Sequence, residues 1–217
     1  MTLPAPGSTS RTTVKRIPDR AVTDRNIAYS IIDAALLAHV AVVIDGQPFV
    51  MPVACARDGD VLLFHGSSAS RLFKALGSGS PCCATVTLLD GLVVARSAFE
   101  SSMNYRSVVA LGRAELLEGD EKARALDVIT EHLMPGRLAD ARPTQAQELK
   151  ATAVARLALT EISVKVRSGG PDEPHEDREL PIWAGVLPIS RAYEPAITES
   201  DVPDGVTEPE YIKTWRP

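Results

Sequence analysis

A segment that reads as strand, turn and helix, residues 61–76, carries the side chains best suited to bind an anion. Ser67, Ser68 and Ser70 precede a helix that opens with Arg71, and the following apolar residues recur at helical spacing. The first turn of a helix has backbone N–H groups without internal partners, and the helix dipole adds partial positive charge there. Hydroxyls and a guanidinium at that point favour a phosphate group. A serine cap beside a solvated arginine would give the same pattern, so this segment alone leaves both interpretations open.

The composition argues against a protein that binds nucleic acid or a membrane. The chain has 217 residues, 45% of them hydrophobic, and a net charge of −5. A chain with this net negative charge has no overall positive field that would attract nucleic acid or anionic lipid. No apolar run approaches the roughly 20 residues of a membrane span, and the N-terminus lacks the apolar region of a secretory signal. We therefore expect a cytoplasmic protein with neither nucleic acid nor a membrane as its partner.

The cysteines are expected to be small, largely buried apolar residues in a reducing compartment. Cys82 and Cys83 are adjacent and would point to opposite faces of a strand, and no CxxC spacing occurs. The spacing therefore favours neither a disulfide framework nor a metal site. The acidic run at residues 172–177 includes His175, but it is expected to be a solvated loop rather than a metal site.

Turn signals divide the chain into short strands joined mostly by hairpins. Asp45-Gly46 is the strongest of these signals, and Asp90-Gly91 is interpreted in the same way. Strands are expected at residues 39–44, 47–53, 61–65, 82–88, 92–99, 105–117, 154–166 and 181–188. Helices are expected at residues 24–37, 71–76 and 119–133, with a short one that begins at residue 144.

This pattern predicts a mainly β fold, an antiparallel barrel with peripheral helices. Closure of a barrel removes exposed sheet edges. A doubly wound parallel sheet is disfavoured because the strands alternate with turns more often than with helices, and neither Gly-rich nucleotide motif is present. We expect residues 1–22 to form a flexible basic arm, residues 23–190 the domain, and residues 191–217 an acidic tail.

The order of these features resembles the pyridoxamine 5'-phosphate oxidase-like, FMN-binding split-barrel superfamily. Within it, the sequence is most similar to the flavin-nucleotide-binding proteins related to nitroimidazole-resistance proteins. The resemblance spans residues 24–189. The segments that carry it are residues 45–52, 63–71, 86–97, 103–108, 163–167 and 180–186.

The resemblance implies a split barrel that binds FMN at a homodimer interface. The residues that would hold the phosphate and ribityl end are His65, Gly66, Ser67, Ser70 and Arg71. Those that would line the ring or complete the site are Pro52, Val53, Thr87, Asn104, Tyr105, Arg106, Ser107 and Trp183. Lys165 and Arg167 share one face of a predicted strand, where they would either bind a substrate anion or lie on a solvated exterior.

Several of these assignments leave alternatives open. Tyr105 and Arg106 are adjacent on a predicted strand, so at most one of them faces the cofactor. Trp183 would otherwise fill the core. His65 is interpreted as a flavin contact or a structural histidine rather than a general base, although its ordinary pKa leaves proton transfer open.

The function favoured at this stage is an FMN-dependent oxidoreductase that acts on a small organic substrate. Activity on pyridoxamine phosphate is disfavoured because Leu72 follows Arg71, where those oxidases have a Ser-Arg-Lys run, and because their C-terminal Arg/His pattern is missing. No catalytic residue is assigned, since flavin chemistry needs mainly positioning from the protein. The alternatives are a non-catalytic flavin-binding module, and a split barrel that uses deazaflavin or haem in place of FMN.

Overall fold

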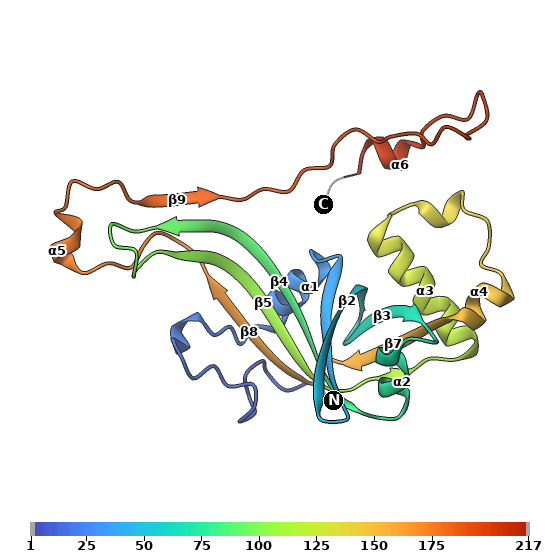
Figure 1. Cartoon of the computed structure of the whole chain (residues 1–217), viewed down its shortest axis with the longest axis horizontal. Helices are drawn as coiled ribbons and strands as arrows, with labels where there is room; N and C mark the ends of the chain where they lie inside the picture. The colour runs from blue at the N-terminus through green and yellow to red at the C-terminus, as the bar shows by residue number, and fades with distance from the viewer. Residues whose placement is uncertain (1–2, 216–217) are drawn as a thin grey trace.

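The computed structural model, which describes residues 3–215, shows an antiparallel sheet curled into a split barrel (Figure 1). Eight strands lie in the order β6-β7-β3-β2-β1-β4-β5-β8, and β9 pairs with β4. The strands are β1 Leu37–Ile44, β2 Gln47–Asp58, β3 Val61–Ser67, β4 Pro81–Val94, β5 Ser102–Arg113, β6 Glu115–Leu116, β7 Thr152–Ala158, β8 Glu161–Arg167 and β9 Gly185–Pro188. The predicted fold class is therefore confirmed.

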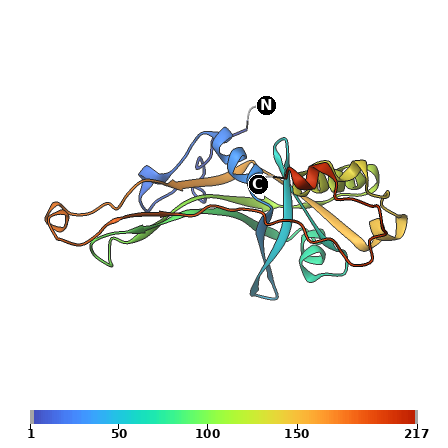
Figure 2. The same cartoon turned by 90° about the horizontal axis from the view of Figure 1, so that it is seen from above.

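Short helices lie at the periphery of the sheet. They are α1 Arg25–Asp33, α2 Arg71–Gly77, α3 Gly119–Leu133, α4 Ala146–Ala151, α5 His175–Arg178 and α6 Glu210–Lys213, with 3-10 turns at Pro18–Arg20 and Arg137–Ala139. Asp24 caps α1, because its carboxylate accepts a hydrogen bond from the Asn26 N–H at 2.8 Å. Figure 2 shows that β4, β5 and β8 extend away from α3 as a thin layer.

The main core lies inside the curled sheet and follows the period-2 alternation of the strands. Val40 and Val42 of β1 are buried, whereas Val43 on the opposite face is 59% exposed. Ile31 of α1 and Leu72 of α2 pack into the same core. A second cluster forms on the outer face of the sheet, where α3 covers β3 and β7.

β4 is one continuous strand where the sequence pattern predicted two strands and a turn. Asp90-Gly91 is a bulge, after which β4 continues to pair with β5. The glycine serves a close approach, since a Cβ on Gly91 would lie 2.9 Å from the carbonyl oxygen of Leu187 in β9. Asp90 meanwhile pairs with Arg106 of β5. The predicted hairpin at this position is wrong because the dipeptide makes room for a third strand.

The single strand predicted over residues 154–166 is also wrong. It is two strands, β7 and β8, which pair with β3 and β5 respectively, in different parts of the sheet. The bend falls at Leu159-Thr160, where the Leu159 N–H donates to the Asp60 carbonyl at 2.9 Å and the Leu159 side chain is fully buried. No glycine or proline marks this bend, and the apolar alternation runs through it.

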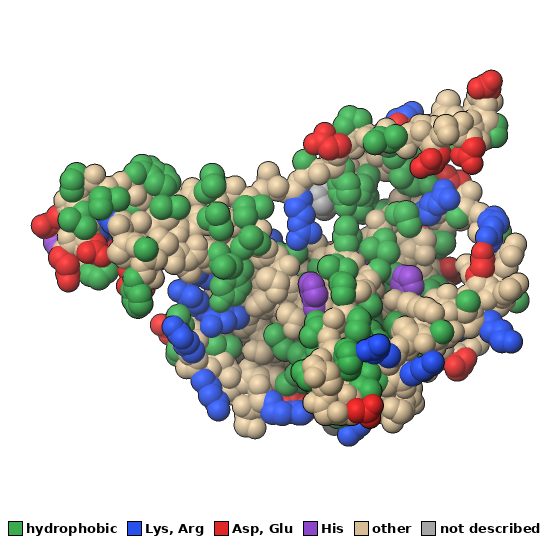
Figure 3. All heavy atoms as spheres, in the orientation of Figure 1, with side chains coloured by type: hydrophobic (Ala, Val, Ile, Leu, Met, Phe, Trp, Pro, Cys, Tyr) green, Lys and Arg blue, Asp and Glu red, His purple; other side chains and the backbone are tan. Residues whose placement is uncertain are grey.

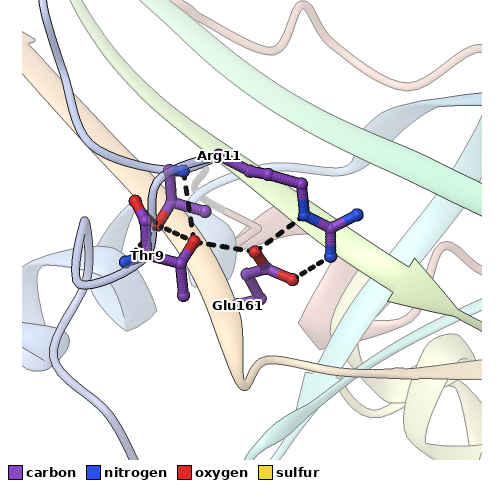
Figure 4. A network of polar contacts seen from close by, with 4 residues as sticks. Thr9, Arg11 and Glu161 are labelled. Carbon is purple, nitrogen blue, oxygen red and sulfur yellow. Dashed lines mark hydrogen bonds and ion pairs between the residues drawn. The ribbon is translucent and has the colours of Figure 1, made fainter.

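The N-terminal arm lies against β8. The Gly7 N–H donates to the Ile162 carbonyl at 2.8 Å, and the Val22 N–H donates to the Val164 carbonyl at 3.1 Å. Figure 4 shows Thr9 and Arg11 converging on Glu161, where the Thr9 hydroxyl donates at 2.7 Å. These hydrogen bonds lower the pKa of Glu161, with the Arg11 guanidinium as the largest cause. The arm therefore covers the free edge of β8.

The C-terminal segment returns across the molecule to α3 (Figure 1). The Tyr211 hydroxyl donates to Asp140 at 3.0 Å and accepts from Arg137 at 3.2 Å. No helix within residues 3–215 combines the length and apolar character that a bilayer crossing requires. Cys55 and Cys82 are buried and Cys83 is partly buried, all as free thiols, which agrees with their expected apolar role.

Candidate functional site

A cavity of about 440 Å³ opens between β2 and the start of α2. Its volume falls within the range of small-molecule sites. Six residues that the sequence assigned to the cofactor line this cavity: Pro52, Val53, Gly66, Ser67, Ser70 and Arg71. The remaining lining residues are apolar. The cavity thus has an apolar wall and one polar end, formed by the serine-containing turn.

The serine-containing turn, residues 67–70, is held by its own hydrogen bonds. The Ser70 N–H donates to the Ser67 carbonyl at 3.0 Å, and the Ser67 hydroxyl accepts from the Ala69 N–H at 3.2 Å. Ser70 also caps α2, because its hydroxyl accepts from the Phe73 N–H at 3.4 Å. The cap interpretation is therefore confirmed, and it leaves the hydroxyls beside the cavity.

Arg71 presents its charge to the cavity without a carboxylate partner. Its side chain is exposed, and its guanidinium lies 4.6 Å from the centroid of the Phe49 ring. In the described part of the chain Arg71 forms no ion pair. A planar guanidinium that is positioned by an aromatic ring and engaged in no ion pair is suited to bind phosphate through two hydrogen bonds.

The packing of Phe73 explains why residue 66 is a glycine. A Cβ at this position would lie 2.6 Å from Cε2 of Phe73, a distance that real side chains do not adopt. Phe73 in turn lies with its ring centroid 6.2 Å from that of Phe64 in the core. The glycine therefore lets α2 approach β3 closely and fixes the floor of the cavity.

His65 lies on the opposite face of β3 from Phe64 and Gly66, outside the lining of the cavity. Its side chain is half-buried, and burial lowers its pKa, which favours the neutral imidazole. The imidazoles of His65 and His39 form no hydrogen bond with other residues of the described range 3–215. In contrast, His132 contacts the Ala35 carbonyl at 2.7 Å, and His175 lies 3.9 Å from Glu179.

The predicted site residues of β4 and β5 do not reach the cavity within one chain. Thr87 pairs with Ser107 across the two strands, and the Ser107 hydroxyl donates to the Lys165 carbonyl at 3.3 Å. Arg106 forms a two-point ion pair with Asp90 at 2.7 and 2.9 Å, while Tyr105 lies on the other face of β5. The Arg106 guanidinium is thus already engaged.

Asn104 and Arg167 form a buried polar pair. An Arg167 nitrogen donates to Asn104 Oδ1 at 2.5 Å, and the amide of Asn104 donates to the Gly169 carbonyl at 3.0 Å. Burial lowers the pKa of Arg167, and the nearby charge of Arg20 lowers it further. Arg167 and Lys165 share a face as predicted, but Lys165 donates to the Arg16 carbonyl at 3.1 Å. Both cations therefore donate hydrogen bonds to backbone carbonyls of neighbouring segments.

Trp183 lies at the surface and is 68% exposed. The alternative that it fills the core is therefore wrong. Its ring packs over Gly185, where a Cβ would lie 2.9 Å from Trp183 Cζ2. Trp183 does not line the cavity beside Arg71.

Glu173 is a buried acid that the sequence pattern did not reveal. Its side chain is 2% exposed and accepts hydrogen bonds from the Arg96 N–H at 2.5 Å and the Arg96 guanidinium at 2.6 Å. The expectation of a solvated acidic loop is wrong for this residue, because Arg96 lies beyond the end of β4, far from it in sequence. In residues 3–215 no cluster of three or more histidine, cysteine or acidic side chains could hold a metal ion.

The family model for pyridoxamine 5'-phosphate oxidase matches residues 24–166, which is more than half of the chain. The protein therefore belongs to this family, whose split-barrel fold it shares, and the resemblance drawn from the sequence is confirmed.

Two solved structures are similar to this protein over most of its length. The flavocytochrome Anf3 from Azotobacter vinelandii is 45% identical, with a TM-score of 0.92 over 98% of this chain and 99% of that one. The FAD and haem binding protein from Mycobacterium smegmatis is 39% identical, with a TM-score of 0.86 over 89% of this chain and 96% of that one.

More distant similarity extends to a structure from Bacteroides thetaiotaomicron described as a 5-nitroimidazole antibiotic resistance protein. It is 24% identical, with a TM-score of 0.58 over 67% of this chain and 86% of that one, and it supports the fold alone. A search of curated proteins gave no match.

Proposed function

We propose that this protein binds a flavin together with a haem and exchanges electrons between them and a small organic substrate. The cavity beside Arg71 carries the proposal, because its apolar wall suits an aromatic ring and its polar end suits a phosphate. The names of the relatives at 45% and 39% identity, a flavocytochrome and an FAD and haem binding protein, support the same assignment.

The flavin fits the residues present at the cavity. Met51, Val53 and Leu72 provide the apolar wall, and Ser67 with Arg71 provides hydrogen-bond donors and a positive charge for the phosphate. A bound flavin supplies hydride and single-electron chemistry, and the protein contributes position and electrostatics. A small-molecule substrate would lie against the exposed side of the ring.

The haem requires an axial ligand, for which a neutral imidazole is suited. Among the described residues, His65 is the better candidate of the two histidines whose imidazole forms no hydrogen bond, because it is half-buried and burial lowers its pKa, which favours the neutral form. His39 is exposed on β1. His65 also directly precedes Gly66, which lines the flavin cavity.

The absorption spectrum of the purified protein tests this function. We expect a flavin band and a Soret band, with the flavin released on denaturation. His65→Ala should abolish the Soret band and retain the flavin band, whereas His175→Ala, an exposed histidine far along the chain, should retain both. Protein that binds neither flavin nor haem when both are supplied would refute the proposal, and a Soret band lost only in His39→Ala would refute the assignment of His65.

The proposed assembly is a homodimer with the flavin at its interface. Leu37, Val43 and Val50 are 46%, 59% and 59% exposed on the outer face of β1 and β2, and Leu89 of β4 is 41% exposed on the same face. Figure 3 shows further apolar side chains over the part of the sheet where β4 and β9 lie. Contiguous exposed apolar surface of this kind is typical of an interaction site. A second copy would bring its β4 and β5 residues to the flavin.

Analytical ultracentrifugation tests the assembly. The wild-type protein should sediment at twice the mass of the chain. Val50→Asp places a charge within the apolar face and should shift the protein toward monomer and lower its flavin content. Val206→Asp, at a residue of the C-terminal segment that is 61% exposed, is the matched control and should remain dimeric. A monomeric wild type that retains flavin would contradict the proposal.

A further inference from the structure

Positive charge is concentrated on the N-terminal arm, in a chain whose net charge is −5. Residues 3–23 contain four basic side chains and one acid, Asp19. Three of the four, Lys15, Arg16 and Arg20, form no ion pair with another of the described residues, and we call them the basic strip. Lys15 and Arg16 are exposed and Arg20 is partly exposed. Figure 3 shows basic side chains gathered where Figure 1 places the arm and β8.

The basic strip is fixed in position on β8. Ala21 forms an antiparallel bridge with Lys165, and the Lys165 ammonium donates to the Arg16 carbonyl at 3.1 Å. At the other end of β8, Arg11 forms an ion pair with Glu161, which is the only acid of that strand. The strip therefore keeps one position relative to the sheet, and the charge of the β8 acid is already balanced.

β8 adds two further cations to this side of the molecule, Lys165 and Arg167. Arg167 is buried, donates to the Gly170 carbonyl at 3.1 Å, and forms no ion pair within residues 3–215. Burial is the largest cause of its lowered pKa and the charge of Arg20 is the next, whereas Asp172 acts in the opposite direction. The repulsion between the two guanidinium groups indicates that positive potential accumulates here.

The basic strip lies close to the strand that is proposed to complete the flavin site of a second copy. β8 pairs with β5, and Lys165 lies opposite Ser107 in that register. Residues 104–107 of β5 are among those that the proposed homodimer brings to the flavin. Because electron transfer slows steeply with distance, a protein docked on the strip is well placed to deliver electrons to that site.

An exposed strip of cations fits the acidic face of another protein. Opposite charges steer two proteins together and select which faces meet, and redox proteins commonly make weak contacts of small area in this way. A nucleic acid fits less well, because single strands stack on aromatic side chains and residues 3–22 contain none.

We propose that the basic strip docks a small acidic protein that carries single electrons and supplies them for the proposed function, on which this inference rests. In each encounter the carrier is oxidised by one electron and the bound cofactor is reduced by it. One encounter converts ferric haem to ferrous haem, and two encounters with two protons from solvent reduce a flavin fully. No bond forms between the proteins, so a brief encounter is sufficient.

Stopped-flow reduction of the flavin- and haem-loaded protein by a reduced plant-type ferredoxin, an acidic one-electron carrier, tests this proposal. At an ionic strength of about 0.01 M, Lys15→Glu combined with Arg16→Glu and Arg20→Glu should lower the second-order rate constant about 10-fold to 100-fold. At about 1 M, where the Debye length is ~3 Å, wild type and the triple variant should react at similar rates. Dithionite, a small reductant that needs no docking, should reduce both proteins equally.

A matched pair of single variants separates the strip from the net charge. Arg16→Glu should slow reduction by ferredoxin about 3-fold to 10-fold, whereas Arg178→Glu reverses an exposed arginine of α5 and should react like wild type. Equal slowing in the two variants would overturn the proposal. Equal rates for wild type and the triple variant at low ionic strength would also overturn it, and so would a strip that binds a DNA duplex but no ferredoxin.

Failure of the proposed function gives a different result. In that case the protein loads neither cofactor, or dithionite does not reduce what it binds. Docking is then measured by isothermal titration of oxidised ferredoxin into the protein at low ionic strength. Binding that is lost in the triple variant supports the docking surface, and binding that is absent or equal in both proteins overturns it.

Discussion

Replacement of Arg71 by alanine is expected to weaken flavin binding about 10-fold to 150-fold, or ~1.5–3 kcal/mol. Arg71 is the cation at the polar end of the cavity, and it forms no ion pair with a carboxylate of residues 3–215. A phosphate that loses a charge-assisted partner loses about this much binding free energy. Isothermal titration of flavin into flavin-free protein measures the change directly.

Two further variants separate a lost phosphate contact from a damaged fold. Arg71→Lys retains the charge but not the two-pronged donor geometry, so it should bind with intermediate affinity. Arg178→Ala removes an exposed arginine of α5 and should bind like wild type. Thermal unfolding of Arg71→Ala should change little, because the side chain is exposed, forms no ion pair within residues 3–215, and gains only a small stabilisation from an exposed cation–π contact with Phe49. Unchanged flavin affinity in Arg71→Ala would rule out the phosphate assignment.

Glu173→Ala is expected to lower the free energy of unfolding by about 3 kcal/mol. The carboxylate of Glu173 is buried and is the partner of both the backbone N–H and the guanidinium of Arg96. The Arg96 Nε is already buried without a partner, so removal of Glu173 would leave this guanidinium largely unsatisfied. Urea unfolding followed by circular dichroism measures the loss.

The same acidic run supplies the control for this prediction. Glu176 is exposed, and Glu176→Ala should change the free energy of unfolding by less than about 0.5 kcal/mol. Glu173→Gln keeps the shape of the side chain and part of its hydrogen bonding, so its effect should lie between the two. Equal stability of Glu173→Ala and Glu176→Ala would show that the Arg96 contact does not stabilise the fold.

The features that sequence predicted well are local ones. Asp45-Gly46 forms a tight turn between β1 and β2, with both residues at positive φ, as this dipeptide favours. The turn before Arg71 likewise depends on residues close to one another in sequence, and the predicted strand, turn and helix are all present, with the turn at the polar end of the cavity. In both cases the physical cause lies within a few residues of the pattern.

The features that sequence missed depend on distant partners. Asp90-Gly91 has the composition of a hairpin turn, but its glycine admits β9, which follows almost a hundred residues later. In the sequence, Glu173 resembles its solvated neighbours. Only the fold brings it into contact with Arg96, which is 77 residues away along the chain. Lys74, Lys122 and Lys150 line one cavity but come from three helices, α2, α3 and α4, and no local pattern relates them.

β7 is synthesised long after its pairing partner β3, and this order affects how the chain can fold during synthesis. β3 lies between β2 and β7, but β7 follows β3 by some ninety residues, and Arg25 reaches the carbonyl of Leu159 across 134 positions. Until that part of the chain leaves the ribosome, β3 presents an unpaired edge to its surroundings. Closure of the barrel is therefore a late event of high contact order, and the nascent chain is most open to aggregation before it occurs.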